Sequence, residues 1–329
     1  MELPIELRDA VNSELAGRSP KELAPVVENL SKRYRSSLQA AVEERLVQTS
    51  DDAAAYAAFR LPATYGAVYG ALGQVKAQLP EFRPTSLLDV GAGPGTAMWA
   101  AHHPDLWQDS LEKVTLLERE AAMISLGKRL AAQSSLSSIR KAEWVPVDIT
   151  GDWPTGSHDL VVTAYVLGEL PEEARPVFVQ QLWEKTGGVL VIIEPGTPAG
   201  FARIRKAREM LLNLEGNLVA PCPHQGSCPI GDDDWCHFTQ RVARSRLHRQ
   251  VKAGELGYED EKFAFTAFSR QQGEACRGRV IRHPQIRKGH VRLKVCTSAG
   301  LIDWVVSRKD KDVYRNARNL KWGSPVDLP

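Results

Sequence analysis

The chain has 329 residues, of which 43% are hydrophobic and 25% are charged, as in an ordinary soluble globular protein. No apolar run approaches the ~18 residues that a membrane-spanning helix requires, so we expect no membrane partner. The N-terminal residues have the pattern of neither a secretory signal nor an organelle transit peptide, which predicts a cytoplasmic location. The length allows one large domain with an appendage, or two domains.

The net charge of +2 hides an asymmetry between the two parts of the chain. Residues 1–199 carry 18 Lys and Arg against 26 Asp and Glu, whereas residues 200–329 carry 24 against 14. A basic C-terminal part favours a polyanionic partner, most simply RNA or DNA. A solvated charged face explains the same composition equally well.

Residues 1–80 predict an N-terminal helical domain. Ser19-Pro20-Lys21-Glu22 is a capping box with proline at the first helical position, so a helix should begin there. Two further helices are expected over residues 51–60 and from there to about Leu79, with a break at Pro62.

Residues 81–200 predict a Rossmann-like α/β core. Five short apolar segments read as strands, at residues 86–90, 114–117, 142–147, 160–164 and 189–193. Helical segments lie between them, which is typical of βαβ units and a parallel sheet.

The remainder divides into a cysteine-rich, basic insertion at residues 201–260 and a basic lobe of closing antiparallel strands at residues 261–329. In the insertion we expect a basic amphipathic helix over 201–214 and an arginine-rich helix over 238–252. In the lobe, strands are expected over 263–268, 291–295 and 302–306, with a turn at Ser298–Gly300 joining the last two as a hairpin.

A glycine-rich turn, Gly91-x-Gly93-x-Gly95, follows the first predicted strand directly. Such a turn brings backbone N–H groups and a helix N-terminus to a bound ligand. A tight turn without a ligand is the alternative. The spacing departs from the G-x-G-x-x-G pattern of dinucleotide sites, which disfavours NAD.

Asp89 before the glycines, with Glu118 at the end of the next strand, resembles the class I S-adenosylmethionine-dependent methyltransferases. The resemblance implies that Glu118 binds the ribose hydroxyls and that Asp148, after the third strand, binds the adenine amino group. It also implies that Gly91 and Gly93 let the backbone approach the methionine part of the cofactor. The alternative for each acid is a helix cap or a solvated loop position.

Catalytic residues are less defined. After the fourth strand the chain lacks the Asn/Asp-Pro-Pro-aromatic motif of base-amino methyltransferases, and no cysteine precedes Cys222 to serve as a cytosine-C5 nucleophile. Tyr165 and Glu169 are the candidates at the substrate side, with packing or capping as the alternative. The sequence leaves open the methyl acceptor and whether catalysis is retained.

Three of the five cysteines, Cys222, Cys228 and Cys236, fall within one short segment. Thiolates gathered by prolines and glycines are typical of a bound metal or cluster. The gaps between them are wider than in a zinc knuckle, and a fourth ligand is needed. The candidates for that ligand are Cys276, Cys296, His224 and His237.

Several segments resemble the methyltransferase-like proteins associated with the small ribosomal subunit, bacterial and mitochondrial. They are Pro221–Pro229, Asp234–Phe238, Tyr258–Phe263, Lys294–Thr297, Glu194–Gly200 and Lys288–Val291. The similarity extends from about Arg60 to Trp322.

The resemblance implies a [4Fe–4S] cluster held by Cys222, Cys228, Cys236 and Cys296, with Cys276 as a free thiol. Zinc is the alternative, because four thiolates suit either occupant. The family also implies binding to small-subunit ribosomal RNA and a role in subunit assembly or translation.

Basic residues on both sides of the cysteines are the candidate RNA contacts. They are Arg241, Arg244, Arg246, Arg249, Lys252, Arg287 and Lys288. The metal would then hold these side chains on a rigid surface. The leading interpretation is a methyltransferase or methyltransferase-like factor acting on the small subunit. The alternatives are a non-catalytic assembly factor that uses the fold as an RNA scaffold, and a redox or iron sensor.

Overall fold

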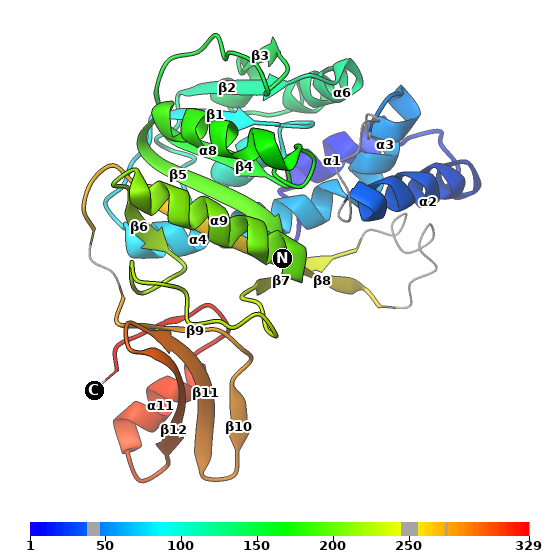
Figure 1. Ribbon diagram of the computed structural model, residues 1–329. Coiled ribbons are helices and arrows are strands. Elements are labelled where there is room, and N and C mark those ends of the chain that lie inside the picture. The colour runs from blue at the N-terminus through cyan, green and yellow to red at the C-terminus, as the bar shows by residue number, and fades with distance from the viewer. Residues whose placement is uncertain (38–46, 245–255, 274–275, 329) are drawn as a thin grey trace.

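A computed structural model describes residues 1–37, 47–244, 256–273 and 276–328 (Figure 1). Its centre is a mixed sheet in which the strands follow the order β3-β2-β1-β4-β5-β8-β6, with β7 paired to the free part of β8. These strands are β1 (Ser86–Val90), β2 (Lys113–Glu118), β3 (Glu143–Pro146), β4 (His158–Ala164), β5 (Thr186–Pro195), β6 (Asn217–Ala220), β7 (Phe238–Ala243) and β8 (Tyr258–Ser269).

Strands β1 to β5 are parallel, and β8 runs antiparallel to β5, β6 and β7. This confirms the expected α/β fold, and each of the five predicted strands is found within a few residues of its expected bounds. Because the carboxyl ends of parallel strands meet at one edge of a sheet, the loops after β1, β2, β3 and β4 lie together there.

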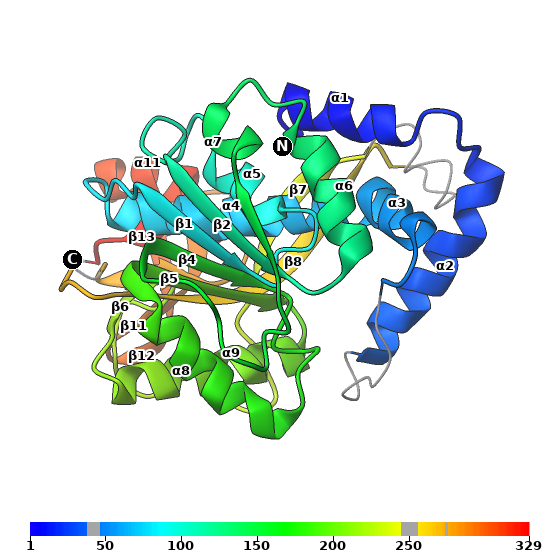
Figure 2. The ribbon, with the colours of Figure 1, turned by 90° about the horizontal axis from the view of Figure 1, so that it is seen from above.

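Helices cover both faces of the main sheet, as the view from above shows (Figure 2). One face packs against the helices α4 (Leu61–Gln78), α5 (Thr96–Ala101), α6 (Ala121–Ala131) and α7 (Ser137–Arg140). The helices α1 (Ile5–Glu14), α2 (Pro20–Ser37) and α3 (Ser50–Phe59) extend the same core by packing on other helices. The other face packs against α8 (Arg175–Glu184), which follows the short 3-10 helix Glu172–Ala174, and α9 (Pro198–Asn213). Successive residues of β4 point to opposite faces of the sheet, so Val162 packs in the core with α4 and α5, and Val161 packs in the core with α8 and α9.

The capping box predicted at Ser19 is present at the start of α2. The Glu22 carboxylate accepts the backbone N–H of Ser19 at 2.8 Å, and the Ser19 hydroxyl accepts the N–H of Glu22 at 3.3 Å. None of the helices in the described ranges is both long and apolar enough to cross a bilayer.

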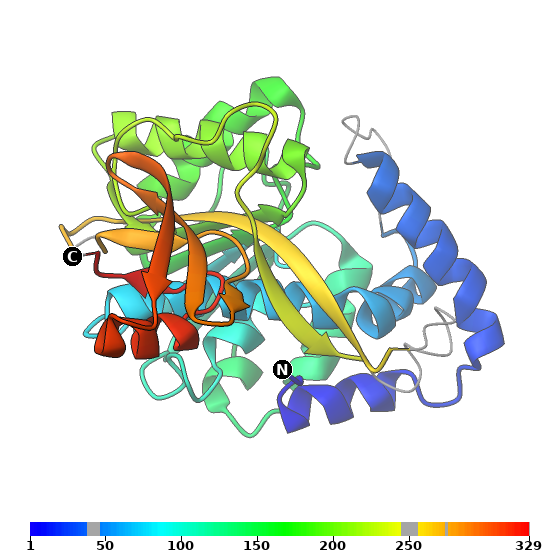
Figure 3. The same ribbon diagram turned by 90° about the horizontal axis from the view of Figure 1, so that it is seen from below.

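A second, smaller sheet lies beneath the main one (Figures 1 and 3). Its strands are β9 (Gly278–Val280), β10 (Gln285–Arg287), β11 (His290–Thr297), β12 (Gly300–Ser307) and β13 (Pro325–Val326). The predicted hairpin is confirmed, with Thr297 of β11 opposite Gly300 of β12. Helix α11 (Lys311–Asn319) packs on this sheet, and the two share a core of their own.

The arginine-rich helix expected over residues 238–252 is wrong in its described part. Residues Phe238–Ala243 form β7, which pairs with β8 from Phe263 to Tyr258. The spacing of the arginines imitates a helical face, whereas the pairing partner of this segment lies about 20 residues further along the chain, where a local pattern gives no sign of it.

Candidate functional site

The glycine turn between β1 and α5 has the backbone that its sequence requires. Gly91, Gly93 and Gly95 have φ angles of +70°, +54° and +80°, a region that side chains with a Cβ rarely adopt. A Cβ on Gly91 would lie 2.4 Å from Val166, so this glycine is needed for packing. A Cβ on Gly93 would meet only the Tyr56 hydroxyl, at 4.0 Å. The backbone of Gly93 is therefore open to a ligand.

Asp89, the last residue but one of β1, is buried. Its carboxylate accepts hydrogen bonds from the backbone N–H groups of Met98 and Ala97, while Oδ2 has no partner among the described residues. Burial raises the pKa of Asp89 to about 7, and the nearby charge of Glu118 adds to the rise. Asp89 thus fixes the N-terminus of α5 behind the glycine turn.

Glu118 ends β2 and holds the glycine turn directly. Its Oε2 accepts the N–H of Gly93 at 2.7 Å, and its Oε1 accepts the N–H of Glu120 at 2.8 Å. Burial raises the pKa of Glu118, and these two backbone hydrogen bonds oppose that rise. The carboxylate is thereby fixed beside the open face of Gly93.

Asp148 lies at the same edge of the sheet, two residues after β3. Its Oδ1 accepts the backbone N–H and the hydroxyl of Thr150 at 3.0 and 2.8 Å, which forms an Asx turn. Its Oδ2 lies 4.0 Å from Nη1 of Arg119, and 57% of the side chain is exposed. Asp148 is thus a solvated loop residue that also lies close to Arg119, the residue that follows Glu118.

Tyr165 is held in an uncommon conformation after β4. It has φ = +65°, which is strained for an aromatic residue, and such strain is found mostly at functional sites. Its hydroxyl donates to Oε1 of Glu261 at 2.8 Å. The Arg60 guanidinium lies 4.6 Å from the ring centre and 3.2 Å from that same Glu261 oxygen.

Glu169 is half-buried in the same loop. Burial raises its pKa to about 8, and the charge of Glu118 adds to the rise. At neutral pH this carboxyl is therefore mainly protonated. Glu169 interacts electrostatically with Glu118 and so lies on that side of the sheet edge. Tyr165 instead donates a hydrogen bond to Glu261 of β8.

A buried ion pair that was not expected from the sequence supports this loop. Glu194, near the end of β5, has no exposed surface. It accepts the N–H of Leu167 at 3.0 Å and Nε–H of Arg203, on α9, at 2.6 Å. Glu194 ends β5 much as Glu118 ends β2, so the same strand-end pattern could have found it.

Four of the five cysteines line one cavity, which holds about 40 Å³. Cys222, Cys228 and Cys236 come from the segment 221–237 between β6 and β7, and Cys296 comes from β11 of the small sheet. Burial raises the pKa of Cys222, Cys236 and Cys296, the last to about 12, and neighbouring thiols add to each rise. These thiols are neutral unless a cation offsets their charge.

The other candidate ligands differ in position. Nε2 of His224 lies 3.8 Å from Sγ of Cys296. His237 instead stacks on Trp235, with ring centres 5.3 Å apart, and meets the edge of Trp322 at 4.8 Å. Cys276 does not line the cavity. Among the described residues, no three His, Cys, Asp or Glu side chains are already spaced to hold a metal ion.

Two buried arginines fasten the cysteine segment, and this role was not apparent from the sequence. Arg208 of α9 donates from Nη2 to the carbonyls of His224 and Gly226, at 2.9 and 2.7 Å. Arg279 of β9 donates from Nε to the Pro221 carbonyl at 2.8 Å and from Nη1 to that of Gly323 at 3.0 Å. The cysteines are thus carried by a loop that helix α9 and the small sheet hold in place.

The candidate RNA-contacting residues fall into three groups. Arg241 and Arg244 pair with acids of β8, with Asp260 at 2.8 Å and Glu259 at 3.2 Å. Arg287 and Lys288 are exposed at the β10–β11 turn. Arg246, Arg249 and Lys252 lie outside the described residues.

A model of the Rsm22 family, described as mitochondrial small ribosomal subunit Rsm22, matches residues 50–327. The ribosome assembly protein METTL17 of Homo sapiens is 33% identical over 83% of this chain, and the aligned part is 62% of its own length. The ribosome assembly protein RSM22 of Saccharomyces cerevisiae is 22% identical over 98% of this chain and 74% of its length.

Among solved structures, the magnesium protoporphyrin IX methyltransferase of Synechocystis PCC 6803 is similar at 15% identity, with a TM-score of 0.42. The alignment covers 73% of this chain and 91% of that one. The strand order and the glycine turn are those of a class I S-adenosylmethionine-dependent methyltransferase fold.

One expectation is contradicted. The relatives and the family description are mitochondrial by name, so the cytoplasmic location expected from the N-terminal residues is wrong. That expectation used only the first few residues, whereas the similarity extends over most of the chain. With a match over residues 50–327 and 33% identity to a curated member, the chain belongs to the Rsm22 family.

Proposed function

We propose that this protein binds S-adenosylmethionine and methylates the small ribosomal subunit during its assembly, using a cysteine-bound [4Fe–4S] cluster to shape an RNA-binding lobe. The observation that carries the proposal is the open backbone of Gly93 beside the fixed Glu118 carboxylate. That arrangement offers a carboxylate for ribose hydroxyls and uncovered backbone for the rest of the ligand.

The residues present fit the cofactor chemically. Glu118 retains acceptor capacity beyond its two backbone hydrogen bonds, since a carboxylate can accept about four. The Oδ2 of Asp148 lies outside the Asx turn and 4.0 Å from Nη1 of Arg119, and it is the oxygen to which we assign the adenine amino group. When bound, S-adenosylmethionine supplies an electrophilic methyl group. The chain's own part is to orient the donor and to present the acceptor at the side of Tyr165 and Glu169.

For the cysteines we propose the [4Fe–4S] cluster rather than zinc. Four cysteine thiolates are the usual ligands of such a cluster. A single zinc ion needs all four sulfurs about 2.3 Å from one point, whereas a four-iron cluster spreads them over several irons. Four cysteines that share one cavity are the ligand set that a cluster held by cysteine alone requires. The 40 Å³ cavity must widen, which the segment 221–237, free of helix and strand, permits.

The small sheet supports an RNA contact. On β11, Arg292 and Lys294 alternate with the buried Val291, Leu293 and Val295, so both basic residues point away from the core. Arg287 lies opposite His290 and shares that outer face. With Lys288 at the turn, these side chains present cations to phosphates without base readout.

Methyl transfer tests the proposal. Small-subunit particles are incubated with the protein and labelled S-adenosylmethionine, and incorporation is compared with that of Glu118→Ala. The matched control is Glu143→Ala, which removes an exposed acid from the neighbouring strand. We expect incorporation to be lost only in Glu118→Ala. Incorporation that both variants retain would refute the enzymatic assignment.

A non-catalytic assembly factor is the second candidate. It is favoured by the Tyr165 hydroxyl, which is already engaged by Glu261. In that case wild type binds both the cofactor and the particles yet transfers no methyl group.

Anaerobic purification with iron, sulfide and zinc analysis decides which metal or cluster the cysteines bind.

A further inference from the structure

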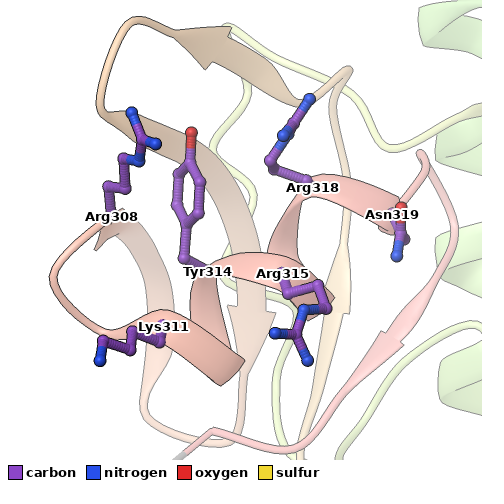
Figure 4. A pocket seen from close by; sticks show the side chains of 6 residues that line it. All are labelled: Arg308, Lys311, Tyr314, Arg315, Arg318 and Asn319. Carbon is purple, nitrogen blue, oxygen red and sulfur yellow. The ribbon is translucent and has the colours of Figure 1, made fainter.

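A basic hollow of about 550 Å³ lies on the small lobe, at α11 and the turn that precedes it (Figure 4). None of the residues that line it belongs to the basic groups expected to contact RNA. They are Arg308, Lys311, Tyr314, Arg315, Arg318 and Asn319. The hollow is also separate from the cysteine cavity, with which it shares no lining residue.

The positive charge of this hollow is largely uncompensated. Residues 308–321 contain six Lys and Arg against two Asp and Glu. Among the described residues, Arg315 alone of the four lining cations pairs with a carboxylate, that of Asp312 at 3.4 Å, and both side chains are mostly exposed. Such an exposed pair contributes little energy, so the hollow as a whole attracts anions.

An aromatic ring stands among these cations. Figure 4 shows Tyr314 between Arg308 and Arg318, with its ring rising from α11 into the hollow. The Arg318 guanidinium lies 5.9 Å from the ring centre. Tyr314 is half-buried, and its inner part packs against the core of the small sheet, which fixes the orientation of the ring.

We propose that this hollow binds unpaired nucleotides of a single-stranded RNA segment. A base stacks on Tyr314, and the adjoining phosphates pair with the Arg308, Lys311 and Arg318 side chains. Aromatic and guanidinium planes are the surfaces on which unpaired bases stack, whereas bases within an A-form duplex are not accessible to them.

An acidic peptide would satisfy the cations but would leave the ring without a flat partner, so the aromatic side chain favours RNA. The inference rests on the proposed function, in which this lobe faces the small-subunit RNA. It adds to the outer sheet face a second contact with a different chemistry, selective for unpaired RNA.

The test uses the full chain and a fluorescent oligouridine of ~10 nucleotides, followed by anisotropy at several salt concentrations. Tyr314→Leu loses the stacking of one base, worth ~1–3 kcal/mol, so it should bind the oligonucleotide about tenfold more weakly than wild type. Tyr314→Phe keeps an aromatic ring and should retain the wild-type affinity. The double variant Arg308→Ala/Arg318→Ala should lower the salt slope by about 0.7 for each phosphate that is no longer neutralised. Lys309→Ala removes an adjacent exposed cation that does not line the hollow, and is the matched control.

Because Tyr314 also packs on the core, the arginine variant gives a readout that does not depend on folding around that ring. Affinities of both variants equal to that of Lys309→Ala would overturn the inference. So would equal binding of a duplex of the same length, or equal competition by polyglutamate. The proposed function is judged separately, by the binding of wild type to small-subunit ribosomal RNA itself, so the two can fail independently.

Discussion

Gly93 and Gly17 provide a matched pair at the scale of single residues. Both have positive φ, +54° and +85°, and neither has an atom closer than 4.0 Å to the position of an added Cβ. Alanine at either position costs about 1 kcal/mol or more of backbone strain without a steric clash. Only Gly93 lies in the glycine turn beside Glu118.

We therefore expect Gly93→Ala to lower the affinity for S-adenosylmethionine strongly, and Gly17→Ala to leave it unchanged. The two variants should lose similar thermal stability. Titration calorimetry with S-adenosylmethionine measures the affinity, and thermal melts of the apo proteins measure the strain. Equal affinities in the two variants would contradict the placement of the cofactor at Gly93.

Asp89 makes stability depend on pH with a defined sign. Its pKa is about 7 in the folded chain and about 3.8 when exposed, because burial disfavours the charged form. Between these values the unfolded chain binds fewer protons than the folded one. The free energy of unfolding therefore falls as pH rises from about 4 to about 7. Asp89→Asn should remove this dependence on pH. The free energy of unfolding of the variant relative to that of wild type should therefore increase as pH rises from about 4 to about 7.

Asp159 supplies a control of the opposite sign. The hydroxyl and N–H of Thr85 and the N–H of Ser86 donate to its carboxylate and outweigh burial, so the pKa of Asp159 is lowered. Its contribution to stability is lost as pH falls through that lowered pKa. Urea unfolding from pH 3 to pH 8 should give difference curves of opposite slope for Asp89→Asn and Asp159→Asn. A flat difference curve for Asp89→Asn would show that its carboxyl is not perturbed by burial.

At the scale of elements, the sequence predicts what local patterns encode. The strands that end at Val90, Glu118 and Ala164 were found because apolar runs ending in a turn or an acid are local signals. The β7–β8 pairing was missed because Arg241 finds its partner, Asp260, across strands rather than along a helix. The Glu194–Arg203 pair joins β5 to α9, and although Glu194 near the end of a strand is a local signal, its pairing with Arg203 is not.

Helix α9 bears on both candidate sites, since Arg203 supports the loop after β4 and Arg208 supports the cysteine segment. Arg208→Ala removes two hydrogen bonds to that segment and leaves its carbonyls short of donors, at a cost of ~1–3 kcal/mol. We expect this variant to retain less iron and sulfide per chain after anaerobic purification. Lys206→Ala, on the same helix, breaks only an ion pair with Glu172 in which both side chains are mostly exposed, lies outside the cysteine cavity, and should retain wild-type amounts.

Iron content of Arg208→Ala equal to that of Lys206→Ala would show that Arg208 does not support the cysteine segment. Thermal melts provide the complementary check. Arg208 is buried and Lys206 is exposed, so loss of iron with an unchanged melting temperature would locate the effect at the cysteine site rather than in the fold as a whole.

At the scale of the whole molecule, the cysteine cavity lies where the two sheets meet. Three of its cysteines come from the connection between β6 and β7 of the main sheet, and Cys296 comes from β11 of the small one. The three clustered cysteines are a local signal in the sequence. Cys296 is about 60 residues further on, so the residues alone left it among four candidates and only the family resemblance selected it.

Strand β11 takes part in two cores. Cys296 packs with the α8–α9 core of the main sheet, whereas its neighbour Val295 belongs to the core of the small sheet. A metal bound to all four thiolates would therefore cross-link the two sheets. Its removal should loosen the small sheet against the main one while leaving the strands at the centre of the main sheet intact, because local opening follows local contacts.

Amide hydrogen exchange on anaerobically prepared protein tests this cross-link. We expect Cys296→Ser to increase exchange in β9, β11 and residues 221–237, and to leave β1 and β4 unchanged. Cys276→Ser is the matched control, because Cys276 lies outside the cavity and its loss should change neither exchange nor iron content. Chelation of the metal from wild type should reproduce the Cys296→Ser pattern. Uniform exchange increases in both variants would indicate general destabilisation, and no increase in Cys296→Ser would show that the two sheets are held together by packing alone.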